Sequence, residues 1–128
     1  MNLEMNNMTL KAEEVRLGNH VLYNGVPHVV DRLIRRSIRT IPASKGMTVD
    51  DYEPIPLTEE WLEKFGFISD GVVWMKDNIA IGDYKSGYFY IPFAVRIAYR
   101  HPNEIKYVHR LQNLYFALRD EELTLKEE

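Results

Sequence analysis

The sequence contains no cysteine, and this absence excludes several kinds of site at once. Without a thiol, the chain has no disulfide framework, no thiolate nucleophile and no thiolate-ligated metal. It also lacks any apolar run near the roughly 20 residues that span a bilayer. Its first residues have neither the basic start nor the apolar middle of a signal peptide. These absences favour a cytoplasmic protein without a membrane partner.

The motifs of the common catalytic and metal sites are missing as well. There is no glycine-rich phosphate loop, no Gly-x-Ser-x-Gly nucleophile elbow and no His-Glu-x-x-His pair. For His109 a hydrogen-bonded structural role outweighs metal binding, although a site assembled from distant segments stays open as an alternative. We therefore predict no catalytic residue, no cofactor and no metal, and an enzyme is the minority interpretation.

The composition is that of one globular domain. The 128 residues are 45% hydrophobic and 27% charged, and the formal net charge of −3 argues against a general nucleic-acid coat. We predict a flexible N-terminal extension over residues 1–9 and a single α+β domain over residues 10–128. Within it, residues 10–48 form the β-hairpin or barrel-like part and residues 49–128 the helix–sheet–helix part.

Turn residues place the first strands. Asn24-Gly25 separates two β-rich runs, 19–23 and 26–33, and a type I′ hairpin turn requires a pair of this kind. A third strand is expected next, with Ile34, Ile38 and Ile41 as its apolar residues. The same opening also suits a small SH3-like barrel, so the hairpin and the barrel are both kept as interpretations.

A short helix is predicted after a proline-containing loop. Thr58 is a good N-cap, and Leu57 and Leu62 have the spacing of a hydrophobic staple. Gly66 supplies the left-handed residue with which many helices end. The buried side of this helix is expected to consist of Trp61, Leu62 and Phe65.

The rest of the chain is predicted to form an antiparallel sheet and a final helix. The β signal extends from Ser69 to Tyr107, with a turn at Asp77-Asn78 and strict alternation over residues 93–100. A helix is expected over 108–118, packed on this sheet. Its apolar stripe consists of Val108, Leu111, Leu114, Tyr115 and Leu118.

A second patch, here called the helix patch, lies on the opposite side of the final helix and consists of His109, Gln112, Asn113 and Phe116. An amide-rich surface centred on a phenylalanine is unusual for a freely solvated helix face. In one interpretation a loop or the N-terminal hairpin covers this side. In the other it is a contact surface for a partner protein or a second copy of the chain, because aromatic residues are enriched at interfaces. A ligand pocket is the third alternative.

Two stretches, YEPIPLTEEWLEKFGF and YVHRLQNLYFAL, resemble a family of small uncharacterised proteins from gut-bacterial genomes, often within phage-like or mobile segments. The family pattern is similar to Leu-Thr-x-x-Trp-Leu-x-x-Phe-Gly-Phe and Tyr-Val-His-x-Leu-Gln-Asn-Leu-Tyr. The first stands at 57–67 and the second at 107–115 of this chain, and the opening LGNHVLYNG is also similar. A Thr-Gly helix stop is expected after Leu118, where this chain has Arg119-Asp120. The resemblance implies no established activity.

Charge is uneven in one segment. Residues 28–45 carry five basic side chains against one acid, Asp31, in a chain that is negative overall. Arg32, Arg35, Arg36 and Arg39 are the candidates for contact with nucleic-acid phosphates, and Arg96 and Arg100 are candidates to extend that surface. The alternative is a solvated strand edge that charge protects from aggregation.

The sequence thus predicts an α+β protein without catalytic function. The favoured role is a protein-interaction module of phage or mobile-element origin that binds a partner protein or itself through the helix patch. The alternative role is a nucleic-acid-binding accessory protein that uses residues 32–39.

Overall fold

The computed structural model describes residues 10–83, 89–90 and 104–126. They form two compact units, one from residues 1–55 and 107–114 and the other from residues 56–106 and 115–128. The sequence analysis divided the domain after residue 48. That the two units belong to one domain stays a prediction. The predicted extension 1–9 and the predicted strand 93–100 lie outside the described residues.

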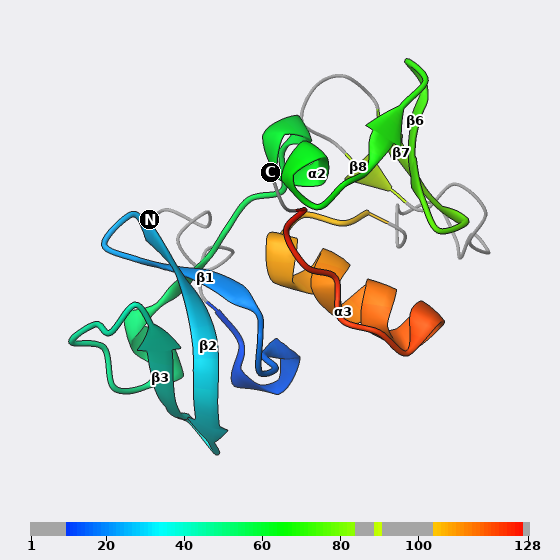
Figure 1. The fold of residues 1–128 in the computed structure, drawn as a ribbon. Coiled ribbons are helices and arrows are strands. Elements are labelled where there is room, and N and C mark those ends of the chain that lie inside the picture. The colour runs from blue at the N-terminus through cyan, green and yellow to red at the C-terminus, as the bar shows by residue number, and fades with distance from the viewer. Residues whose placement is uncertain (1–9, 84–88, 91–103, 127–128) are drawn as a thin grey trace, which may run out of the picture. The chain divides into compact units, whose positions relative to one another are not determined.

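The first unit contains an open antiparallel sheet with the order β3-β2-β1-β4 (Figure 1). The strands are β1 (His20–Tyr23), β2 (Val26–Ile34), β3 (Ser37–Ile41) and β4 (Glu53–Pro54). The predicted hairpin is confirmed, because Asn24 and Gly25 have φ of 51° and 78°, as a type I′ turn requires. The barrel interpretation is wrong, because β3 and β4 lie at opposite ends of the sheet and do not pair.

The third strand is confirmed, but its inward residues differ from the predicted apolar set. Ile38 and Thr40 are buried, whereas Ile34 and Ile41 are 60% and 59% exposed. Ile34 ends β2, and the two-residue turn that follows it sets the alternation of β3. The register of β2 and β3 shifts between Val30 and Arg32, so Ile34 faces the side opposite to the buried Val30. Ile41 alternates with the buried Ile38 and Thr40 in β3 and therefore points outward as well.

The core of the first unit lies against the inner face of this sheet. A 3₁₀ turn, η1 (Ala12–Glu14), precedes β1, and a second, η2 (Val49–Asp51), precedes β4. Thr48 and Asp51 form a capping box at η2. The backbone N–H groups of Met47 and Thr48 donate hydrogen bonds to the Asp51 carboxylate and lower its pKa. The buried cluster consists of Leu10, Val15, Val21, Val30, Ile38, Val49 and Tyr52.

In the second unit the predicted short helix is confirmed as α2 (Glu59–Lys64). The Thr58 hydroxyl accepts a hydrogen bond from the Trp61 N–H at 3.3 Å. The helix ends in a Schellman motif, in which Gly66 has a φ of 92° and the Phe67 N–H donates to the Leu62 carbonyl at 3.0 Å. Leu62 and Phe65 are buried as predicted, while Trp61 is only half-buried.

The second unit also contains an antiparallel sheet with the order β5-β6-β7-β8. Its strands are β5 (Ile68–Ser69), β6 (Val73–Lys76), β7 (Ile79–Asp83) and β8 (Phe89–Tyr90). The predicted turn is confirmed, since Asp77 and Asn78 both have positive φ, 50° and 70°. The Ile105 N–H donates to the Phe89 carbonyl at 2.8 Å, so the residue Ile105 is hydrogen-bonded to strand β8 of this sheet.

The final helix, α3 (Val108–Arg119), is confirmed, and no described helix is long and apolar enough to cross a bilayer. Its residues to Leu114 belong to the first unit and those from Tyr115 to the second. Within the second unit the Tyr115 hydroxyl donates to the Asp77 carboxylate at 2.5 Å. Burial, together with that carboxylate, raises the pKa of Tyr115 to about 12.

The predicted apolar stripe of α3 ends early. Val108, Leu111 and Tyr115 are buried, but Leu118 is 59% exposed. Asp120, with a φ of 58°, takes the left-handed position that a glycine was expected to fill.

Candidate functional site

The structure places the helix patch mainly in the interior of the first unit. His109 and Gln112 are each 1% exposed, and Asn113 is half-buried. The segment from Glu14 to His20 covers these three side chains, so His109 and Gln112 are not a surface of the folded unit. Phe116 belongs to the second unit, where it is half-buried.

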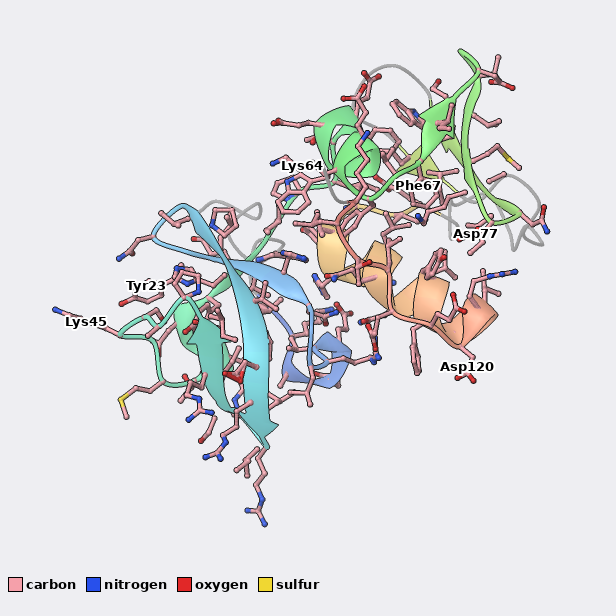
Figure 2. All side chains as sticks on the ribbon, in the orientation of Figure 1. Tyr23, Lys45, Lys64, Phe67, Asp77 and Asp120 are labelled. Atoms are coloured by element: carbon pink, nitrogen blue, oxygen red, sulfur yellow. The ribbon has the colours of Figure 1, made fainter. Side chains whose placement is uncertain are left out.

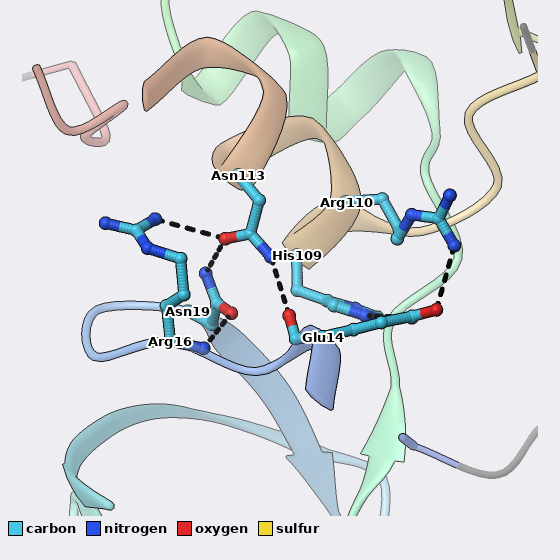
Figure 3. Close-up of polar contacts among 6 residues, drawn as sticks. All are labelled: Glu14, Arg16, Asn19, His109, Arg110 and Asn113. Atoms are coloured by element: carbon cyan, nitrogen blue, oxygen red, sulfur yellow. Dashed lines mark hydrogen bonds and ion pairs between the residues drawn. The ribbon is translucent and has the colours of Figure 1, made fainter. Parts of the chain in front are cut away.

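The carboxamides of Gln112 and Asn113 bind the segment before β1. Gln112 accepts the His20 N–H at 2.8 Å and donates to the Gly18 carbonyl at 2.9 Å. Asn113 accepts from the side chains of Arg16, at 3.1 Å, and Asn19, at 2.9 Å (Figure 3). It also donates to the Glu14 carbonyl at 2.6 Å. Both ends of each amide are used, which is what a buried amide requires.

A third contact joins the same two segments. His109 Nε2 lies 3.3 Å from Glu14 Oε1, and Arg110 Nη1 lies 3.1 Å from Glu14 Oε2 (Figure 3). The Tyr107 ring stacks on the imidazole, with 5.9 Å between the ring centroids. Among the described residues, Nδ1 of His109 has no hydrogen-bond partner. Burial lowers the pKa of His109, and the Glu14 carboxylate offsets this in part.

The four candidate arginines lie together on the hairpin of β2 and β3, and all four are exposed. Arg35 and Arg36 form the two-residue turn between the strands. Figure 2 shows nitrogen-bearing side chains gathered at the end of the hairpin where β2 meets β3. We call this surface, Arg32 to Arg39, the arginine ribbon.

Two features of the arginine ribbon destabilise the folded hairpin. Arg32 lies directly opposite Arg39 in the register of the two strands, and like charges in this position are destabilising. Arg35 has a φ of 55°, a conformation in which side chains other than glycine, asparagine and aspartate are disfavoured. Neither feature is needed to form a hairpin, since a neutral residue and a glycine would serve better.

Acidic side chains neutralise only part of the ribbon. Arg36 pairs with Asp50 at 2.5 Å, and Arg39 lies 3.7 Å from Asp31. Both arginines remain more than half exposed, and exposed pairs of this kind contribute little free energy. Within the described chain, Arg32 and Arg35 make no ion pair. The ribbon therefore keeps a net positive charge.

Edge protection accounts for only part of the ribbon. The edge of β3 is already paired beside the turn, because the Ile38 N–H donates to the Met47 carbonyl at 3.0 Å and the Val49 N–H to the Arg36 carbonyl at 2.9 Å. From Arg32 to Ile34, however, β2 pairs with β3 alone, so edge protection remains the alternative explanation of Arg32.

Charge is also divided between the units. The first unit contains eight Lys and Arg against seven Asp and Glu, whereas the second contains eight against twelve. The negative charge of the whole chain therefore resides in the second unit. The sequence pI of 5.8 does not describe the environment of the arginine ribbon.

One interpretation of the sequence was that a loop or the N-terminal hairpin covers the helix patch, but the sequence did not identify the residues that bind it. It also did not predict the outward position of Ile34 and Ile41 beside the arginines. Arg96 and Arg100, the candidates to extend the basic surface, lie outside the described residues. Among the residues that are described, no group of three or more His, Asp or Glu side chains is placed to hold a metal ion. The exposed guanidinium groups of the arginine ribbon can bind phosphate or carboxylate oxygens.

Comparison of the chain with protein-family models, with curated proteins and with solved structures finds no match in any of the three.

Gln112→Glu should destabilise the protein although the two side chains have nearly the same shape. The substitution removes the donor to the Gly18 carbonyl and places a second oxygen there, and it buries a charge. We expect a loss of about 2–4 kcal/mol in the free energy of unfolding, measured by urea denaturation. Glu63→Gln, at an exposed position, is the control and should change stability by less than about 0.5 kcal/mol. A Gln112→Glu variant as stable as the parent would contradict the assigned hydrogen bonds.

Stability should fall between neutral and mildly acidic pH because of His109. Its pKa is lower in the folded state than the ordinary value near 6.5, so below that pH the unfolded chain takes up a proton that the folded chain does not. The contribution of the neutral His109 to the free energy of unfolding is complete above a pH of about 6.5. It is lost as the pH falls towards the lower pKa of the folded state, at no more than about 1.4 kcal/mol per pH unit.

Urea denaturation from pH 8 to pH 5 measures this effect. His109→Gln should flatten the profile, because it removes the imidazole whose pKa burial lowers. An equally steep profile in the His109 variant would assign the pH dependence to another group.

Proposed function

We propose that this protein is a non-catalytic binding module and that its arginine ribbon contacts the phosphates of nucleic acid. The observation that carries the proposal is the pair Arg32 and Arg39, two like charges directly opposite each other on an exposed face. An arrangement that costs stability and has no role in forming the hairpin is best explained by a ligand that repays the cost. An anionic ligand does so by neutralising both side chains.

Phosphate suits this surface better than a single carboxylate does. Strand pairing and a two-residue turn fix the backbone positions of the four arginines, so no backbone ordering is needed when they bind a regular row of charges. Nucleic acid presents such a row, and its phosphates dominate the affinity of most proteins that bind it. The phage or mobile-element origin that the resemblance implies remains part of the proposal.

A protein partner is the second proposal, on a different surface from the helix patch. On the second sheet, Ile68 lies directly opposite Met75, and the two are 76% and 41% exposed. Val72, at 65%, is also exposed in the turn between their strands. A partner protein or a second copy of the chain would bury this apolar group.

Fluorescence anisotropy with labelled DNA, from 50 to 200 mM salt, tests the first proposal. Four phosphate contacts give a slope of log affinity against log salt of roughly −3 to −4, so affinity should fall roughly a hundredfold over this range. The double variant Arg32→Glu/Arg35→Gly should bind at least tenfold more weakly at 50 mM salt and reduce the slope by about 2.

The same variant should be as stable as the parent, or more stable. A glutamate at position 32 would attract Arg39 across the strands, and a glycine at position 35 fits the positive φ. Lost binding can then not be attributed to unfolding. Lys106→Glu/Lys126→Ala changes net charge equally at exposed positions of the second unit and should bind normally. Equal weakening by both double variants, or no binding by the parent, would overturn the proposal.

A further inference from the structure

We infer that the nucleic acid bound by the arginine ribbon is double-stranded DNA, met by the outer face of the ribbon in the major groove. This inference rests on the proposed function and adds to it the form of the ligand. It depends on which side chains share the outward face with the arginines and on how wide the ribbon is.

Single strands are disfavoured as the ligand because the ribbon offers no surface for base stacking. Neither β2 nor β3 contains a phenylalanine, tyrosine or tryptophan, and the one aromatic ring there, the His28 imidazole, is buried and bonded to the Pro42 carbonyl. Proteins that bind single strands combine basic grooves with aromatic side chains on which bases stack. A surface of arginine and aliphatic side chains lacks that second component.

The outward face instead alternates basic and aliphatic side chains. In β2, Arg32 is followed two residues later by Ile34, and in β3, Arg39 is followed by Ile41, so all four point to the same side. Ile34 and Ile41 are each about 60% exposed. In the major groove of DNA, arginine binds guanine edges and phosphates, and aliphatic groups contact the methyl group of thymine.

The ribbon is narrow where the arginines lie. Strand β1 pairs with β2 only as far as Val29, so from Arg32 to Ile34 the ladder of β2 is made with β3 alone. On the other side, the segment Met47–Val49 flanks only the residues next to the turn. The major groove of B-form DNA admits a two-stranded ribbon, whereas that of A-form RNA is too deep and narrow for side chains to read.

Anisotropy at 100 mM salt with a duplex DNA, a duplex RNA of the same sequence and each single strand tests the inference. We expect duplex DNA to bind at least tenfold more tightly than the other three. Ile34→Ala/Ile41→Ala should lower affinity for duplex DNA by threefold or more and leave the salt slope unchanged, because no phosphate contact is removed. Ile68→Ala/Val72→Ala removes similar exposed side chains from the second unit and should have no effect.

The outcomes separate this inference from the proposed function. Equal affinity for duplex DNA, duplex RNA and single strands, with the expected salt slope, would overturn the duplex inference and leave the phosphate contact standing. No binding to any nucleic acid would overturn both, as would binding only to vesicles containing phosphatidylserine, the other anionic surface that a basic and aliphatic face suits.

Discussion

The carboxamide of Gln112 is the contact on which the first unit depends most. It accepts the N–H of His20, the first residue of β1, and donates to the Gly18 carbonyl, 92 and 94 residues away in the sequence. Both backbone groups belong to a segment that has no strand partner at those atoms. Since Gln112 is buried, water cannot substitute for it, and an unsatisfied backbone group in the interior costs about 1–3 kcal/mol. Strand β1 is therefore fixed at its start by a helix from the other end of the chain.

The anchored strand β1 lies inside the sheet of the first unit. Strand β1 is paired on one side with β2 and on the other with β4, and β2 in turn holds β3. The arginine ribbon lies at the end of this series, where each strand contributes outward residues that the core does not use. A like-charged pair and an arginine with positive φ can be tolerated there because the buried cluster of the unit supplies the stability. The helix patch and the arginine ribbon thus have opposite effects, since the helix patch stabilises the fold and the ribbon destabilises it.

Local chemistry allowed much of the fold to be predicted from the sequence. Asn24-Gly25 and Asp77-Asn78 adopt positive φ at both residues, and Thr58 and Gly66 begin and end α2 as expected. These signals succeed because each is decided within a few residues. The partners of Gln112 and Asn113 were beyond such reasoning, because periodicity shows that a helix face is polar but not which distant segment covers it. The register shift between Val30 and Arg32 likewise turns Ile34 outward, and hydrophobicity alone did not reveal it.

The sequence showed the arginine ribbon as a run of basic residues, but its interpretation required the register of β2 and β3. Only the pairing of Arg32 with Arg39 shows that the charges lie opposite each other on the two strands. The most direct measurement is a titration of the uniformly ¹⁵N-labelled protein with a short DNA duplex, followed by two-dimensional NMR. We expect the largest shift changes at residues 32–39, with little change at 14–20 and 109–113. Changes centred on Ile68 to Met75, or none at twofold excess of duplex, would contradict the account.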